Sequence, residues 1–261
     1  MPATERLYAI RRWMLGTFVP EFLWPRTVDV DGVPIRLRNA PYSFGTKWIL
    51  RKGTYEKPER QLLHQIIRPG MQVLELGGSI GIVTSVLAKL VGPSGRVVSV
   101  EASASLTEHS RTWLHSPGRV DIVTGYAFPV WSLPAGMRVG TLEKECSLGG
   151  VVPFSIDQSG PAAATSAAPI ASDNTEVFDL SSLCARFDLR PDALVADVEG
   201  SEAVMISQPP SLPGSIRFVC IELHPHQYPN GDKDQQAIVD ALVREGFRVA
   251  GRVHASWLFE R

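Results

Sequence analysis

The sequence predicts an α/β fold with a doubly wound, mostly parallel sheet of seven strands, preceded by a helical arm and a hairpin. Over most of the 261 residues, short apolar runs alternate with segments of helical spacing, a pattern typical of parallel sheets. One run enters a glycine-rich turn that opens a helix, and two closely spaced apolar segments near the C-terminus predict an antiparallel strand pair. A chain of this length can bury one large core.

The segment 73–101 carries the strongest local signal. An apolar strand at 73–76 runs straight into the glycine turn, and an apolar helix follows over 82–90. A second strand, at 96–100, then ends at Glu101. Glycines let the backbone approach a ligand, and an acid about 20 residues after the last glycine can hydrogen-bond ribose hydroxyls. The segment therefore predicts a nucleotide-binding edge. Its glycines are Gly77, Gly78 and Gly81.

The remaining elements follow from the same periodicities. Alternation around Asp31-Gly32 predicts a hairpin at 27–37. Apolar residues at helical spacing predict a helix at 59–67, which ends before Pro69. Further strands are expected at 120–124, 192–197, 217–223, 247–253 and 256–260. Further helices are expected around 105–114, from about 202, and at 233–245.

We expect an arm and hairpin cap at residues 1–58 and a catalytic domain at 59–261. The arm at 5–24 is basic, amphipathic and rich in aromatic residues, so we expect it to pack on its own domain or on a second subunit in a homo-oligomer more readily than on lipid, although a basic aromatic helix can also lie at a membrane surface. Residues 155–172 are small and lack large apolar groups, which predicts a flexible loop beside the site.

The charge and the cysteine content limit which binding partners and which cellular compartment we expect for the protein. Lysine and arginine number 26 against 27 acids, a net charge of −1, so no global basic field argues for nucleic acid or an anionic membrane as a partner, although this leaves room for a local basic patch. The three cysteines are an odd number, and Cys220 lies in an apolar run, which suits a reducing cytoplasm. The apolar stretch at 13–19 is too short to span a bilayer, so we expect no transmembrane segment.

Two polar clusters follow the fourth and fifth expected strands. In an open α/β sheet the ligand lies off the carboxyl ends of the strands, so these clusters should face whatever sits beside a bound nucleotide. The first cluster, at 197–202, holds three acids, and the second, at 222–226, holds an acid and two histidines. The six residues are Asp197, Glu199, Glu202, Glu222, His224 and His226.

The order of residues 75–81, Glu-Leu-Gly-Gly-Ser-Ile-Gly, resembles motif I of class I S-adenosylmethionine-dependent methyltransferases. The resemblance implies S-adenosylmethionine as the cofactor, with the loop under its methionine part and the acid after the second strand on its ribose. Tyr126, just past the third strand, is a candidate for the adenine site or else a rim residue. The cofactor-binding residues implied are Glu75, Gly77, Gly78, Ser79, Gly81, Glu101, Tyr126 and Asp197.

The polar clusters make the resemblance more specific. Residues 197–202, Asp-Val-Glu-Gly-Ser-Glu, and residues 222–224, Glu-Leu-His, are similar to the FkbM family of methyltransferases, whose fourth strand carries Asp-x-Glu-Gly-x-Glu and whose fifth ends in Glu-x-His. The similarity runs from about residue 28 to the C-terminus. Because this family mostly methylates sugar or polyketide hydroxyls, the resemblance implies O-methylation of a sugar, glycan precursor or polyketide-type natural product. The departures from the family pattern are Glu75, Gly78 and Ser79, where Asp, Ala and Asn are more usual.

Methylation of an aliphatic hydroxyl requires that its proton be removed as the oxygen attacks, and His224 is the candidate base. Asp197 or Glu222 would orient the imidazole or the hydroxyl, while Glu199, Glu202 and His226 would bind the acceptor. Asp197, Glu222 and His224 could also ligate Mg²⁺, but we favour a metal-free base because magnesium prefers oxygen ligands.

Two alternatives stay open at the level of sequence. A nicotinamide-dependent oxidoreductase would use the same fold, although the broken Gly-x-Gly-x-x-Gly order disfavours it. A non-catalytic member of the methyltransferase fold would bind cofactor weakly, and the intact acids and His224 argue against it.

Overall fold

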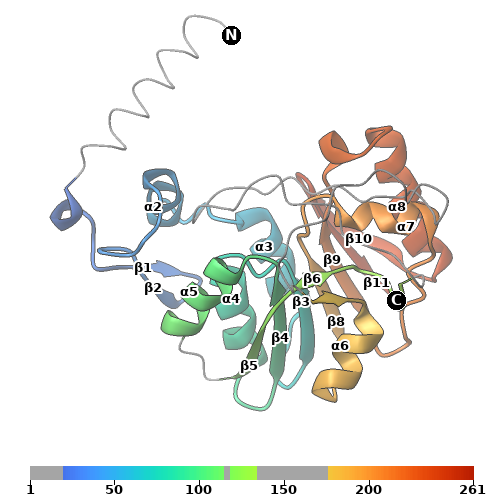
Figure 1. The fold of residues 1–261 in the computed structure, drawn as a ribbon, viewed down its shortest axis with the longest axis horizontal. Coiled ribbons are helices and arrows are strands. Elements are labelled where there is room, and N and C mark those ends of the chain that lie inside the picture. The colour runs from blue at the N-terminus through green and yellow to red at the C-terminus, as the bar shows by residue number, and fades with distance from the viewer. Residues whose placement is uncertain (1–19, 115–117, 134–175) are drawn as a thin grey trace, which may run out of the picture. The chain divides into compact units, whose positions relative to one another are not determined.

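A computed structural model describes residues 20–114, 118–133 and 176–261. These residues form two compact units, one over residues 20–57 and one from Pro58 to Arg261 (Figure 1). Most of the predicted arm and the whole predicted loop at 155–172 lie outside the described residues, so both stay predictions.

The first unit holds the predicted hairpin. Strands β1 (Thr27–Val30) and β2 (Val33–Arg36) pair antiparallel. The turn between them requires positive φ at both central residues, 53° at Asp31 and 76° at Gly32, which an Asp-Gly pair tolerates. The unit also contains a short 3-10 helix, η1 (Glu21–Leu23), and α2 (Phe44–Arg51). The sequence analysis missed α2, whose N-terminus is capped by the Ser43 side chain.

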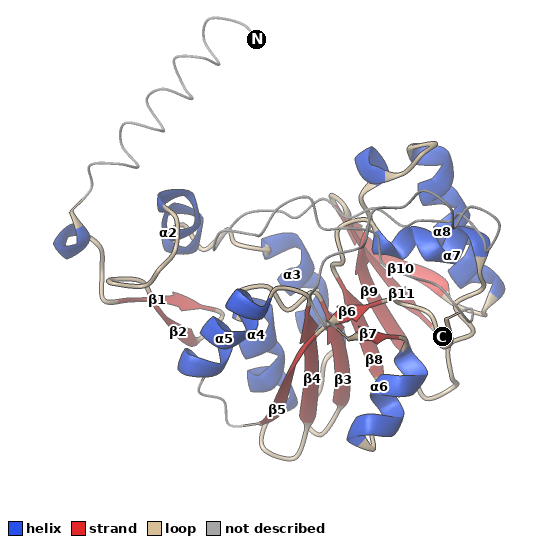
Figure 2. Cartoon of the chain, viewed as in Figure 1, coloured by secondary structure: helices blue, strands red, loops and turns tan. Residues whose placement is uncertain are grey.

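The second unit is built on the predicted seven-stranded sheet, with strand order β10-β11-β9-β8-β3-β4-β5 (Figure 2). All neighbouring pairs are parallel except those that involve β11, which runs antiparallel to both β10 and β9. The mostly parallel sheet and its C-terminal antiparallel pair are thus confirmed. The strands are β3 (Gln72–Leu76), β4 (Arg96–Glu101), β5 (Arg119–Thr124), β8 (Ala193–Ala196), β9 (Phe218–Glu222), β10 (Arg248–Val253) and β11 (Ser256–Glu260).

Helices cover both faces of this sheet, and the alternation of strand side chains explains how. Val73 packs in one core with α3 (Lys57–Ile66) and α4 (Ile82–Val91). Leu74 and Leu76 point to the opposite face, into a core with three helices from the C-terminal part of the chain. Those helices are α6 (Leu180–Phe187), α7 (Val204–Ser207) and α8 (Asp232–Arg244).

The unit also contains a further helix, a pair of short strands and two 3-10 helices, η2 (Ser201–Ala203) and η3 (Pro225–Gln227). Helix α5 (Ala104–Trp113) contacts β4 and β5, whereas β6 (Tyr126–Ala127) and β7 (Val177–Phe178) form a small parallel pair outside the main sheet. The sequence analysis did not predict β6, β7 or α6. Among the described residues, no helix is both long and apolar enough to cross a membrane.

Parallel strands end at one edge of a sheet, so the residues after β3, β4, β8 and β9 are brought together. The glycine turn, the acid that ends β4 and both polar clusters all lie at that edge.

Candidate active site

The glycine turn after β3 is shaped by a close approach between two chain segments. Gly77 has φ of +89°, and a Cβ there would lie 1.7 Å from the carbonyl oxygen of Asp197. No side chain fits, so the first predicted glycine lets the turn touch the start of the acidic cluster after β8. The last, Gly81, also has positive φ and begins α4. The cofactor turn and the polar cluster are therefore in contact.

Two of the predicted cofactor-binding residues, Glu75 and Gly78, make contacts inside the protein that support the glycine turn. Glu75 is only 2% exposed and accepts a hydrogen bond from Thr84 Oγ1 at 2.6 Å. Burial raises the pKa of Glu75 to about 7. At Gly78, a Cβ would lie 2.2 Å from Ser99 Oγ, so this glycine is needed for packing. The assignment of Glu75 to the cofactor site stays a prediction; its enclosed side chain contacts Thr84.

Glu101 links the turn to the end of β4. One carboxylate oxygen accepts a hydrogen bond from the Ser79 N–H at 2.8 Å, and the other accepts one from the Ser103 N–H at 2.7 Å. Burial raises the pKa of Glu101. A carboxylate offers about four acceptor positions, so Glu101 can accept a further hydrogen bond, as from a ribose hydroxyl. Tyr126, the predicted adenine neighbour, is half-buried on β6.

His224 is held by a buried carboxylate from the neighbouring segment. Its Nδ1 lies 2.8 Å from Oε1 of Glu202, which is 0% exposed. The same oxygen accepts a hydrogen bond from the Tyr228 hydroxyl at 2.6 Å, and the other oxygen accepts one from the Gly200 N–H at 2.8 Å. Since an ionised carboxylate only accepts hydrogen bonds, Nδ1 carries the proton and Nε2 carries the lone pair.

Glu202, predicted to bind the acceptor, is enclosed and bonds to Nδ1 of the imidazole. Asp197 and Glu222, predicted to orient the imidazole or the acceptor hydroxyl, lie on the Nε2 side of the ring. These roles stay predictions. Sequence analysis also missed Tyr228, which lies four residues after His224 and is buried.

The Nε2 side of the imidazole faces three more carboxylates. It lies 3.4 Å from Glu199 Oε2, 3.5 Å from Asp197 Oδ1 and 4.0 Å from Glu222 Oε1. Burial lowers the pKa of His224, but the hydrogen bond to Glu202 and the negative charges of the surrounding acids outweigh it, so the net pKa is raised. The pKa of Glu222 is also raised, in its case because burial disfavours the charged form of a carboxyl group. With four acids around one imidazole, the site repels an anionic acceptor.

Two further residues lie beside these acids. His226 is exposed, and its ring centroid lies 5.8 Å from that of His224. Gln227, which the sequence analysis did not single out, donates a hydrogen bond from Nε2 to Glu199 Oε2 at 3.0 Å. Both follow β9, so they are placed to line the edge of an acceptor site.

A divalent cation could also be held here. Asp197, Glu199 and His224 each offer one ligand atom, and these atoms all lie within 4.8 Å of one another. This set differs from the one that the sequence suggested, because Glu199 replaces Glu222. A mixed imidazole and carboxylate set suits zinc or manganese better than magnesium.

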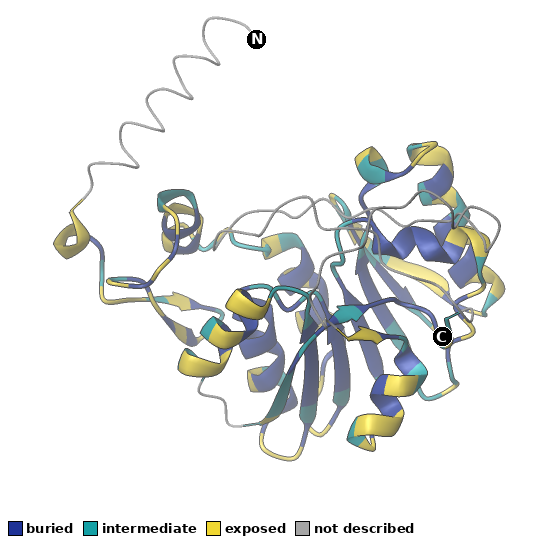
Figure 3. Ribbon diagram, in the orientation of Figure 1, coloured by how far each residue is buried: buried dark blue, intermediate teal, exposed yellow. Residues whose placement is uncertain are grey.

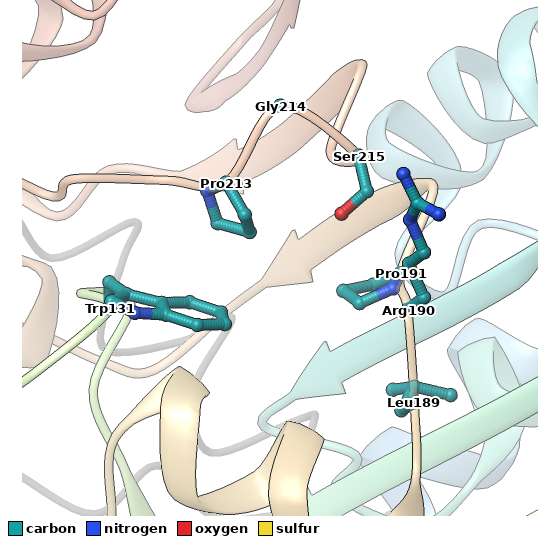
Figure 4. Close-up of a pocket in the computed structure, with 7 residues that line it drawn as sticks. All are labelled: Trp131, Leu189, Arg190, Pro191, Pro213, Gly214 and Ser215. Carbon is teal, nitrogen blue, oxygen red and sulfur yellow. The ribbon is translucent and has the colours of Figure 1, made fainter.

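A separate cavity of about 330 Å³ lies at the opposite end of the strands (Figure 4). Its walls include Pro191 just before β8 and Pro213 just before β9, with Trp131 facing them. It therefore opens near the amino ends of those strands, away from the glycine turn and from His224.

Comparison with known families concerns the cofactor half of this unit. Residues 57–127 match the model of the protein-L-isoaspartate(D-aspartate) O-methyltransferase family. The matched part contains the glycine turn and Glu101 and ends before the acidic cluster. Together with the strand order and the reversed β11, this decides the fold. The chain has the fold of a class I S-adenosylmethionine-dependent methyltransferase.

The chain is also similar to individual proteins. A protein-L-isoaspartate O-methyltransferase of Methanothrix thermoacetophila is 53% identical over 45 residues, which are 17% of this chain and 21% of that protein. The match thus spans about a fifth of the relative's length. Its likeness is confined to a short segment of the chain.

Solved structures resemble this chain only distantly. Fibrillarin of Aeropyrum pernix, in complex with S-adenosyl-L-methionine, gives a TM-score of 0.44 at 12% identity, over 78% of this chain and 73% of that one. A TehB-like S-adenosylmethionine-dependent methyltransferase of Corynebacterium glutamicum gives 0.40 at 11% identity, over 84% and 96%. At these values the acceptor must be argued from the residues of the site.

Proposed function

We propose that this methyltransferase transfers a methyl group from S-adenosylmethionine to a hydroxyl of a sugar, glycan precursor or polyketide-type natural product. The observation that carries the proposal is the pairing of His224 with buried Glu202, at the sheet edge where the glycine turn contacts Asp197. A base oriented in this way is needed for an alcohol acceptor and lies next to the cofactor turn.

Different residues of the chain would have different roles in the reaction. Glu101 would hold the ribose and the glycine turn would pass under the methionine part, while the bound cofactor supplies an electrophilic methyl group on sulfur. Nε2 of His224 would accept the proton of the acceptor hydroxyl as its oxygen bonds to the methyl carbon and the bond from that carbon to sulfur breaks. Glu202 would stabilise the imidazolium that forms. Glu199 and His226 would help to hold the acceptor in line, which supplies much of the rate.

Charge favours a hydroxyl over a carboxyl acceptor. The matched family acts, by its name, on isoaspartate, and a carboxylate is already ionised at neutral pH, so it needs no base. The acids Asp197, Glu199 and Glu222 would repel such an acceptor. A neutral polyol, by contrast, can donate hydrogen bonds to the same oxygens. The same repulsion disfavours the phosphate backbone of a nucleic acid.

Membership of the FkbM family is part of this proposal. Its support is the pair of motifs at 197–202 and 222–224, which contribute Glu202 and His224 to one hydrogen-bonded cluster. These motifs lie outside the residues matched by the isoaspartate family model.

Calorimetric titration with S-adenosylmethionine, S-adenosylhomocysteine and NAD⁺ tests the cofactor. We expect binding of the first two alone; binding of NAD⁺ alone would favour an oxidoreductase. A mass-detected transfer screen against nucleotide sugars, lipid-linked glycans, macrolides and isoaspartyl peptides then tests the acceptor. Methylation of the peptides alone would overturn the hydroxyl assignment, and cofactor binding without transfer to any class would favour a non-catalytic member.

A further inference from the structure

The first unit exposes several large apolar side chains at neighbouring positions. Phe22 and Leu23, on η1, are 70% and 57% exposed. On α2, Trp48 is 43% and Ile49 is 36% exposed. Single exposed apolar residues are ordinary, but a group with two aromatic rings marks an interaction surface. Figure 3 shows η1 as exposed and α2 as divided between buried and exposed sides.

Contacts within the unit hold η1 beside α2. An ion pair joins Glu21, the first residue of η1, to Lys47 on α2. The ring of Phe44 packs edge-on against Trp24 at 5.5 Å and stacks on Trp48 at 6.1 Å. The exposed residues of the two helices are therefore parts of one surface, fixed by buried partners.

The same surface is basic. Arg51 and Lys52 are exposed and follow Trp48 by three and four residues, so they share its side of the helix. Lys52 Nζ lies 5.0 Å from the centre of the Trp48 ring, a cation–π contact. We call this surface the apolar-basic face: Phe22, Leu23, Trp48, Ile49, Arg51 and Lys52.

Charge is distributed unevenly along the chain. Residues 1–57 hold 10 of the 26 basic residues but only 5 of the 27 acidic ones, so their net charge is +5. The other residues, 58–261, hold 16 basic and 22 acidic residues, a net charge of −6. An asymmetry of this kind indicates that the basic part meets an anionic partner.

The side chains of the apolar-basic face favour one kind of partner over the others. A second copy of the chain placed on it in a two-fold dimer would bring two surfaces of the same positive charge together, and like charges repel. Nucleic acid would use the basic residues and a stacking ring but would leave Leu23 and Ile49 without partners. An anionic lipid surface satisfies both kinds of group, because aromatic and aliphatic side chains enter the headgroup boundary while basic ones meet phosphates.

We propose that the apolar-basic face docks the methyltransferase on an anionic phospholipid membrane surface. This inference rests on the first unit alone and is independent of the reaction proposed for His224. The expectation for the arm at 5–24 stays a prediction, because most of the arm lies outside the described residues.

Co-sedimentation of the full chain with phosphatidylcholine vesicles, with and without phosphatidylglycerol, tests the proposal. We expect binding only to the phosphatidylglycerol vesicles, weakened by added salt because exposed charges are screened. Phe22→Ser with Trp48→Ser should reduce the partition coefficient by roughly tenfold or more, since each exposed ring would bury apolar area. Arg51→Glu with Lys52→Glu should reduce it by roughly tenfold or more as well, at about 1 kcal/mol per basic residue.

Val243→Ser is the matched control, because Val243 is 48% exposed on α8 in the other unit. It should bind vesicles as the wild type does, and circular dichroism of every variant should show an unchanged thermal midpoint. The proposal is overturned if the wild type ignores phosphatidylglycerol, if both vesicle types bind equally, or if the control loses as much as the face variants. A concentration-dependent dimer, or an RNA complex, that Trp48→Ser abolishes without any vesicle binding would assign the face to that partner instead.

Discussion

Nδ1 of His224 donates a hydrogen bond to a carboxylate oxygen of Glu202 that also accepts one from the Tyr228 hydroxyl. Glu202 is fully buried, and His224 is only 6% exposed. Two buried donors on one oxygen fix both the ring orientation and the tautomer, leaving Nε2 as the basic atom. As a result, the proton-accepting side of the ring faces Asp197, Glu199 and Glu222.

The tautomer can be tested without knowing the acceptor. Nitrogen-15 spectra of the histidine side chains should show His224 protonated at Nδ1 when its ring is neutral. Glu202→Gln should lower the pKa of His224, because the hydrogen bond and charge of Glu202 raise it. Tyr228→Phe should lower it less or leave it unchanged, since the carboxylate remains. An unchanged His224 pKa in Glu202→Gln would contradict the assigned pairing.

His224→Ala should reduce methyl transfer by roughly 100-fold to 10,000-fold, the range that a general base supplies. Affinity for S-adenosylmethionine, measured by calorimetry, should stay within a few-fold of wild type, because His224 lies on the acceptor side of the edge. His226→Ala serves as the comparison and should change mainly the KM for the acceptor. A loss smaller than tenfold in His224→Ala would reassign the base.

Activity should rise with pH as His224 loses its proton, because only the neutral imidazole can act as a base. Since the pKa of His224 in the protein without ligand is raised above its usual value of 6.5, the rising limb of the kcat/KM profile, which reports groups of the free enzyme, should lie above that value. In Glu202→Gln the limb should move to lower pH while the maximal rate falls, a split that a purely structural role would not produce. A profile without a limb in this range would argue against a histidine base.

The sheet could be predicted from the sequence because its signals are local. Each apolar run is bounded by turn residues, and the glycine turn requires a backbone that glycine alone adopts at Gly77. The missed helix α6 also carried a local signal, an Asp179 cap with Ser182 three residues later. It was overlooked because it follows a segment without periodicity.

The partners of His224 could not be predicted. Which acid contacts which ring nitrogen depends on how deeply each side chain is buried, and not on its position in the sequence. Glu199 and Glu202 are three residues apart in one acidic motif, yet one faces Nε2 and the other is enclosed behind Nδ1. Tyr228 lies in a segment with no motif. Only the packing of the turns after β8 and β9 determines which acid is buried.

Glu101→Ala should weaken S-adenosylmethionine binding by roughly tenfold to 100-fold, since it removes a charge-assisted ribose contact and releases the Ser79 N–H from the glycine turn. Calorimetry measures this directly. Glu108→Ala is the matched control, because Glu108 is an exposed acid on α5 nearby in the chain. Equal affinity in the two variants would remove Glu101 from the cofactor site.

Removal of divalent ions should leave turnover unchanged if His224 acts as a base. The enzyme would be treated with EDTA, exchanged into metal-free buffer and assayed with and without added Mg²⁺, Mn²⁺ or Zn²⁺. Loss of activity that Mn²⁺ or Zn²⁺ restores in wild type, but not in Glu199→Gln, would instead assign Asp197, Glu199 and His224 to a bound cation.

Glu75 should make the protein less stable as the pH rises. Its buried carboxyl has a folded-state pKa of about 7, above the usual 4.5, so the protonated form is favoured in the folded state. The stabilising contribution is complete below pH 4.5 and is lost as the pH rises through about 7. Glu75→Gln, which cannot ionise, should therefore raise the free energy of unfolding by up to about 3 kcal/mol at about pH 8 and by little at about pH 5. Urea unfolding at the two pH values, with Glu108→Gln as the exposed control, measures the difference. A change of equal size at both pH values would mean that the ionisation of Glu75 does not limit stability.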